Sequence, residues 1–237
     1  MKKLTYVVLI LVICLGTFFY IKTDSTSNVS KKSNVDISVD SKFEKYEGGN
    51  TPVLDKYKIL KKINNDIVGW ISIPKTTIDY PIVRTTNNEY YLSHDILKHE
   101  SSWGAVFMEY RDININTDKN IILYGHNMKD QSMFTQITKY KENEFFKNNR
   151  YIYFDTLNIE GKWEVFSAYV AEDSFNYIKT NFKTNEEYLK FLKAITDKSL
   201  FSAKVQLSAK DQILTLSTCS YEFKNARFVV HAKRVNK

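Results

Sequence analysis

The sequence predicts a mostly β fold: an eight-stranded, closed or nearly closed barrel with N-terminal helices, one later helix and an N-terminal transmembrane helix. Three observations predict this fold. Eight short apolar or alternating runs follow one another from residue 68 onward. Few turns of helix are expected between them. A charge-free apolar run lies near the start of the chain. Plentiful aromatic residues and scarce Gly and Pro are typical of a packed domain rather than a disordered chain.

The eight runs that we expect to form strands are short and bounded by polar turns. Alternation of apolar and polar residues indicates strands with one buried face. With so little helix between them, the strands are expected to pair with one another in a barrel. They cover residues 68–73, 78–83, 105–109, 121–124, 151–155, 163–171, 213–218 and 227–235.

Helical spacing appears at the start of the domain and once more near its end. Thr51-Pro52 is typical of a helix N-terminus, and the apolar residues that follow predict a helix over 52–64. A further helical turn is expected at 43–46, before Gly48. Thr184 and Glu187 fit a capping box, which predicts a helix between the sixth and seventh strands. The supporting apolar positions are Leu54, Tyr57, Leu60 and Ile63 in the first helix and Tyr188, Phe191, Leu192 and Ile195 in the second.

The N-terminal region divides into a tip, an anchor and a spacer. Residues 4–21 carry no charge and would span about 27 Å as a helix, close to the hydrocarbon thickness of a bilayer. Lys2 and Lys3 favour a cytoplasmic tip at residues 1–3 and an extracellular domain at 43–237. Polar residues 22–42 are expected to be a flexible linker. The predicted location is therefore the cell membrane with a single pass, and a cleaved signal peptide is the alternative.

Composition and charge limit the classes of partner that the chain is expected to bind. The net charge of +7 could attract an anionic surface such as cell-wall polymer or lipid headgroups, but a merely solvated lysine-rich surface is the favoured interpretation. No stripe of basic and aromatic residues indicates nucleic acid. No Cys/His cluster has the spacing of metal ligands, so neither a metal nor another cofactor is predicted.

Cys219 is the one cysteine outside the predicted anchor, where Cys14 lies. A lone thiol in an extracellular domain has no partner for an internal disulfide, so it is either an inert buried residue or a nucleophile. Alternation along the strand places Cys219 with Thr215 and Ser217 on the more polar face. That placement favours the nucleophile.

His126 and Arg227 are the residues that such a thiol would need. His126 ends an apolar strand, and Gly125 before it allows a sharp exit. Arg227 begins the last strand, and a hairpin around residues 220–226 would set it opposite Cys219. The same register pairs Ser217 with Val229 and Thr215 with His231. An imidazolium stabilises a thiolate and can protonate a leaving amine, while a guanidinium can hold an oxyanion, so the three suit acyl transfer.

At these residues the sequence resembles a known family. The run Thr215-Leu-Ser-Thr-Cys219, the following Arg227 and the upstream Tyr124-Gly-His126 are similar to the sortases of Gram-positive bacteria, and most similar to class B. The resemblance covers roughly residues 43–237. It implies a sortase-type barrel with His126, Cys219 and Arg227 at the catalytic positions. By the same resemblance, the walls of a sorting-motif groove would include Asn88, Leu92, Tyr177, Ile178 and Ser217.

The resemblance implies a membrane-anchored cysteine transpeptidase. It would cleave a C-terminal sorting motif in exported proteins near a Thr–Gly or Thr–Asn bond, form a thioacyl intermediate on Cys219, and pass the acyl group to an amine of peptidoglycan or its lipid-linked precursor. Two alternatives remain open on the residues alone. One is a thiol peptidase or hydrolase resolved by water, and the other is a non-catalytic, membrane-tethered binding barrel.

Overall fold

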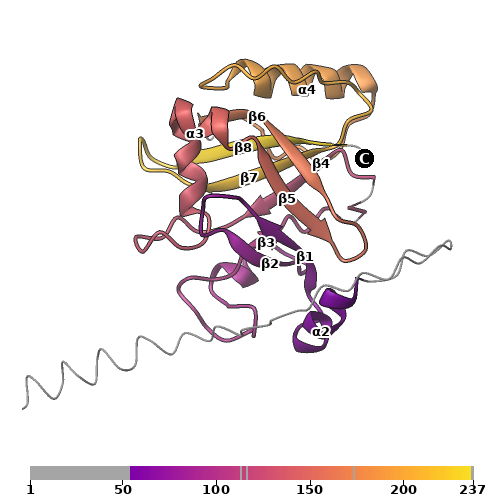
Figure 1. Cartoon of the computed structure of the whole chain (residues 1–237), viewed down its shortest axis with the longest axis vertical. Coiled ribbons are helices and arrows are strands. Elements are labelled where there is room, and N and C mark those ends of the chain that lie inside the picture. Colours follow the sequence, from indigo (N-terminus) through magenta and orange to yellow (C-terminus); the bar gives the residue numbers. More distant parts are fainter. Residues whose placement is uncertain (1–53, 113, 116, 173, 236–237) are drawn as a thin grey trace, which may run out of the picture. The chain divides into compact units, whose positions relative to one another are not determined.

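Eight strands close into a barrel in the computed structural model, which describes residues 54–235 apart from 113, 116 and 173 (Figure 1). The predicted tip, anchor and linker, and the helical turn expected at 43–46, lie outside these residues. Within the described part of the chain, no helix is long and apolar enough to cross a membrane. The eight-stranded barrel predicted from the sequence is confirmed.

The barrel order around the closed sheet is β1-β2-β3-β4-β7-β8-β6-β5. β2 and β3 pair in parallel, as do β4 and β7, and all other neighbours are antiparallel. The parallel pairs require long connections, and those connections carry much of the site described below. The strands are β1 (Ile67–Ser72), β2 (Asp79–Val83), β3 (Phe107–Met108), β4 (Asn120–Tyr124), β5 (Tyr151–Thr156), β6 (Lys162–Ala171), β7 (Ile213–Cys219) and β8 (Arg227–Arg234).

The hairpin of β7 and β8 has the register predicted from the sequence. Cys219 pairs with Arg227, and Thr215 pairs with His231. Side chains of β7 alternate between two apolar clusters: Leu216 packs into the barrel interior, whereas Ile213 packs on the outer face. Because side chains alternate along a strand, Cys219 belongs to the outer face.

Helix α4 (Asn185–Asp197) lies between β6 and β7 in the sequence, as predicted. It covers part of the outer face of the barrel. It lies across the barrel beside β6 in Figure 1. Thr184 caps it by accepting a hydrogen bond from the Glu187 backbone N–H at 3.2 Å. Each large apolar side chain buried in such an interface contributes roughly 1.5–3 kcal/mol. The side chains that α4 buries are those predicted: Tyr188, Phe191, Leu192 and Ile195.

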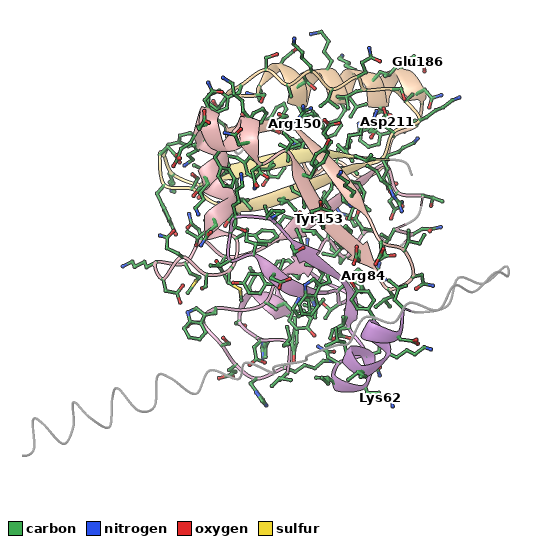
Figure 2. All side chains as sticks on the ribbon, in the orientation of Figure 1. Lys62, Arg84, Arg150, Tyr153, Glu186 and Asp211 are labelled. Atoms are coloured by element: carbon green, nitrogen blue, oxygen red, sulfur yellow. The ribbon has the colours of Figure 1, made fainter. Side chains whose placement is uncertain are left out.

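Helix α2 (Asp55–Ile63) begins three residues later than the predicted start at 52. Leu54 has an extended ψ and occupies the N-cap, whereas Thr51, where the cap was predicted, lies outside the described residues. Tyr57 and Leu60 are buried as expected, whereas Ile63 is 45% exposed because it lies at the last turn. In Figure 2, Lys62 of α2 and Glu186 of α4 lie at opposite ends of the domain.

Two helical segments between β4 and β5 were not predicted. They are the 3₁₀ helix η2 (Thr135–Lys141) and the helix α3 (Asn143–Asn148). A 3₁₀ helix has three residues per turn, so its apolar residues do not follow the 3.6-residue period of an α-helix. A third short piece, η1 (Tyr90–Leu92), lies between β2 and β3. Strand β3 is also shorter than the predicted 105–109, and its ends continue only as single backbone hydrogen bonds.

Candidate active site

Cys219 ends β7 and is half-buried, at a place where three strands come together. β7 lies between β4 and β8, so a residue from each neighbour can flank the thiol. Arg227 is its direct partner on β8. Directly paired residues of neighbouring strands present their side chains on the same face, so the guanidinium and the thiol share the outer face of the barrel.

His126 approaches the thiol from the other side. The parallel register of β4 and β7 pairs Tyr124 with Ser217 at the end of β4, and His126 and Cys219 each lie two residues further along the chain. Two contacts extend that register past the end of β4: Thr218 Oγ1 donates to the Gly125 carbonyl at 2.7 Å, and Asn127 Nδ2 donates to the Cys219 carbonyl at 2.8 Å. The strand ends are therefore locked together at the site.

The ring of His126 is held by a backbone carbonyl. Its Nε2 lies 2.7 Å from the Leu92 carbonyl oxygen. Because a carbonyl can only accept, Nε2 carries a proton in this contact. Nδ1 is then the ring nitrogen that can exchange a proton.

Gly125 has a packing role rather than the conformational role predicted for it. A Cβ at this position would lie 2.6 Å from Cγ of Phe134, which is fully buried. The Phe134 backbone N–H also donates to the His126 carbonyl at 2.9 Å. Gly125 does not adopt a positive φ. Absence of a side chain at 125 is thus what allows Phe134 to pack directly beneath His126.

Arg227 keeps much of its hydrogen-bonding capacity unused. Its Nη1 donates to the backbone carbonyls of Ala226, at 3.1 Å, and Asn225, at 3.4 Å. A guanidinium has five N–H donors, so Nε and Nη2 retain three that have no partner among the described residues. No described carboxylate pairs with it. These three N–H groups are therefore available as donors to an oxyanion.

The five residues expected to contact substrate divide into two groups. Leu92 is 44% exposed and Ile178 is half-buried, so both keep apolar surface that a ligand could contact. The other three are engaged within the protein. Tyr177 and Ser217 are 9% and 2% exposed, and their hydroxyl oxygens lie 3.0 Å apart. The carboxamide of Asn88 donates to Glu109 Oε2 at 2.9 Å and accepts from the Tyr110 backbone N–H at 3.0 Å.

His231, the other histidine near β7, lies in a closed hydrogen-bond chain. Tyr169 donates to its Nε2 at 2.8 Å, and its Nδ1 lies 2.9 Å from Thr215 Oγ1. The Thr215 hydroxyl donates to Asn120 Oδ1 at 2.5 Å, so it must accept from the ring. Complete burial lowers the pKa of His231 to about 3. The ring is neutral and fully engaged, which leaves His126 as the histidine that can meet Cys219.

The series of hydrogen bonds through His231 ends at the segment between β6 and α4 (residues 172–184), which we call the β6–α4 segment. Asn120 Nδ2 donates to the carbonyls of Tyr177, at 3.3 Å, and Lys179, at 2.9 Å. The sequence offered no signal for this role, because Asn120 lies at the start of an apolar strand far along the chain from residue 177. Asn127 was detectable in principle, since it directly follows His126.

Comparison with known proteins identifies the family of this chain. Residues 71–235 match the family model described as a sortase domain. The chain is 37% identical to sortase B of Listeria monocytogenes over 79% of this chain and 77% of that protein. It is 33% identical to sortase B of Staphylococcus aureus over 98% of this chain and 97% of that protein.

Solved structures show the same likeness. The structure of sortase B from Bacillus anthracis in complex with AAEK2 superposes with a TM-score of 0.75 at 41% identity, covering 81% of this chain and 88% of the other. The Staphylococcus aureus sortase B–substrate complex superposes with a TM-score of 0.74 at 36% identity, covering 78% and 86%. The chain therefore belongs to the sortase family of cysteine transpeptidases. Within that family it is a class B sortase.

Proposed function

We propose that this chain is a membrane-anchored class B sortase that cleaves the C-terminal sorting motif of exported proteins through a thioacyl intermediate on Cys219. The acyl group would then pass to an amine of peptidoglycan or its lipid-linked precursor. The observation that carries this proposal is the meeting of three strand ends: Cys219 on β7, Arg227 opposite it on β8, and His126 beside it beyond β4.

In the first half-reaction, the Cys219 thiolate attacks the carbonyl carbon of the scissile peptide bond. The carbon–nitrogen bond breaks, and the leaving amine takes a proton from the His126 imidazolium. The Leu92 carbonyl holds Nε2, so Nδ1 is the nitrogen left to give up that proton. The acyl group remains on sulfur as a thioester.

Arg227 would stabilise the negative oxygen of the tetrahedral intermediate. Its Nε and Nη2 groups have no partner among the described residues, and its pairing with Cys219 places the two residues on one face of the barrel. A planar guanidinium can offer two parallel donors to one oxygen or to an oxygen and a neighbouring carbonyl, and it keeps its charge throughout the cycle.

In the second half-reaction an amine attacks the thioester, gives a proton to His126 and restores the thiolate. If water attacked instead, the product would be a carboxylic acid and the protein would act as a hydrolase. The partners in this proposal are a sorting-motif protein and a cell-wall amine. The existence of a sortase B–substrate complex supports the first. Exposed Leu92 and half-buried Ile178 beside the site offer the apolar contacts that a peptide substrate needs.

The proposed anchor rests on the sequence of residues 4–21 and the lysines before it. Intact protein should fractionate with membranes, with its N-terminus inside the cell, and should be digested by protease added outside the cell. A mature soluble protein that begins near Thr23 would contradict this part of the proposal.

The transpeptidase proposal is tested by mass spectrometry of reaction products. The purified chain is incubated with a library of sorting-motif peptides, with and without candidate cell-wall amines, beside a Cys219→Ala control. The expected product is an amide that joins the N-terminal peptide fragment to the amine, absent from the control. A carboxylic acid as the only product at every amine concentration would indicate a hydrolase.

A further inference from the structure

Glu109 is a fully buried carboxylate that the reaction described above does not use. It lies one residue beyond β3 and is 0% exposed. Burying a charged group costs several kcal/mol unless hydrogen bonds and an opposite charge compensate it. Burial would raise the pKa of Glu109, but hydrogen bonds from Arg111, Asn88 and Tyr124 outweigh it and the pKa is lowered. The group is therefore held as an anion.

Both oxygens of this carboxylate are occupied by side chains from different parts of the chain. Arg111 Nε donates to Oε1 at 2.7 Å. Asn88 Nδ2 and the Tyr124 hydroxyl donate to Oε2 at 2.9 and 2.8 Å. A carboxylate accepts at both oxygens, so it can serve all three donors at once.

The three donors lead to three sides of the catalytic site. Asn88 belongs to the segment between β2 and β3 (residues 84–106), which we call the β2–β3 segment and which also supplies the Leu92 carbonyl to His126. Tyr124 is the last residue of β4, two positions before His126. Arg111 reaches the β6–α4 segment, where its Nη2 donates to the Ile178 carbonyl at 3.2 Å.

Together with Asn120, Arg111 holds three consecutive carbonyls of the β6–α4 segment. Asn120 takes those of Tyr177 and Lys179, and Arg111 takes the one between them. The described residues of this segment pair with no strand, so side chains set its distance from the rest of the site. Glu109 fixes Arg111 and, through Asn88, the segment on the opposite side.

We propose that Glu109 is a positioning residue for the transpeptidase: its carboxylate joins the β2–β3 segment to the β6–α4 segment and thereby sets the spacing of the residues that bind the peptide substrate. The inference rests on the proposed function at one point, namely that these two segments contact the sorting motif. Glu109 itself does not touch the reacting atoms.

Glutamine at this position tests the role of the negative charge with almost no change of shape. Its single carbonyl oxygen can face Arg111 or the pair of Asn88 and Tyr124, and its amide nitrogen must then face a donor. One of the two segments is released in either case. We expect Glu109→Gln to raise the KM for a sorting-motif peptide about tenfold, the scale of one lost charged hydrogen bond, with a change in kcat of no more than about twofold.

A second readout separates positioning from general damage. The Leu92 carbonyl that orients His126 is held independently of Glu109, because the Ala105 backbone N–H donates to the neighbouring Tyr91 carbonyl at 2.9 Å. Alkylation of Cys219 by iodoacetamide needs no bound peptide and depends on the thiol and on His126. Its rate in Glu109→Gln should stay within about twofold of that of the unchanged protein. Asp112→Asn is the matched control, because it removes another fully buried carboxylate from the same β3–β4 connection, one bonded to the Ile122 backbone N–H rather than to either segment. Its KM should not change.

Arg111→Lys keeps a positive charge beside Glu109 but cannot also reach the Ile178 carbonyl through a second planar N–H. Arg111 is partly exposed, so this variant is expected to fold, and its KM should rise about threefold. If Glu109→Gln does not fold, Arg111→Lys decides the matter. An unchanged KM in Arg111→Lys together with an unchanged KM in any folded Glu109→Gln would overturn the inference. A fall in the rate of Cys219 alkylation in Glu109→Gln as large as the rise in its KM would also overturn it. Failure of the unchanged protein to process any sorting-motif peptide would instead overturn the proposed function.

Discussion

Replacing Asp112 with asparagine should stabilise the folded domain progressively as the pH rises from about 4 to about 7. Asp112 is fully buried, and its Oδ1 has no hydrogen-bond partner among the described atoms. Burial raises its pKa from 3.8 to about 7, an effect that the Ile122 N–H opposes and Asp118 reinforces. The folded state therefore binds a proton in this pH range that the unfolded chain has released.

The sign of this effect follows from proton linkage. Where the folded state binds more protons, the free energy of unfolding falls by about 1.4 kcal/mol for each unit of rising pH. Over the interval from 3.8 to about 7 the accumulated loss is at most about 4 kcal/mol. Asparagine does not titrate. The free energy of unfolding of Asp112→Asn, measured relative to that of the unchanged protein, should therefore rise with pH by that slope and level off above pH 7.

His231 has the opposite effect in nearly the same range. Burial lowers its pKa from 6.5 to about 3, so the unfolded chain binds a proton that the folded state does not. Its contribution to the free energy of unfolding rises by about 1.4 kcal/mol per pH unit up to pH 6.5 and is lost as the pH falls. Between about pH 4 and 6.5 the two slopes cancel in the unchanged protein. Asp112→Asn and His231→Gln should tilt the stability profile in opposite directions.

Denaturant unfolding followed by tryptophan fluorescence at several pH values from 4 to 7.5 measures both effects. The quantity of interest is the difference in the free energy of unfolding between variant and unchanged protein, plotted against pH. A double variant should restore the original slope. A flat difference for Asp112→Asn across this range would mean that the carboxyl group is ionised in the folded state, and the reasoning from burial would be refuted.

Three further predictions concern the catalytic site. His126→Ala should abolish peptide cleavage and sharply lower the rate of Cys219 alkylation at neutral pH, whereas His231→Gln should keep most of both, and the reverse pattern would reject the assignment. Arg227→Ala should lower turnover about 100- to 1000-fold, and Arg227→Lys nearly as much, because a point charge cannot reproduce the planar fork of donors; near-full activity of the lysine variant in a peptide-cleavage assay would count against an oxyanion role. Gly125→Ala should lower the free energy of unfolding by about 1–3 kcal/mol and also lower turnover, because the added Cβ would meet the Phe134 ring at 2.6 Å. A second change of Phe134→Leu should recover part of the loss, and turnover equal to that of the unchanged protein would exclude this packing role.

The sequence was a sufficient guide to the strand face that carries the thiol and to the hairpin register. Alternation of residue types along β7 and the eight-residue spacing from Cys219 to Arg227 together determine which residues pair. The helix α4 was equally predictable, because its cap and its apolar period agree.

Long-range hydrogen bonds to backbone carbonyls were not predictable. The contact between His126 and the Leu92 carbonyl cannot be recognised from the residue type at position 92, since every residue has a backbone carbonyl. The short 3₁₀ helix η2 lacks the period by which helices are recognised. In the sequence Glu109 is only the last residue of a predicted strand, and the fold shows that side chains of Asn88, Arg111 and Tyr124 converge on it.

Trapping of the acyl group on Cys219 tests the account most directly. The chain is mixed with a sorting-motif peptide in the absence of any amine, quenched in acid, and measured by intact-protein mass spectrometry with fragment mapping. The account predicts a mass increase equal to that of the N-terminal peptide fragment, located on Cys219 and absent from Cys219→Ala. Peptide cleavage without an adduct on Cys219, or cleavage by Cys219→Ala, would contradict it.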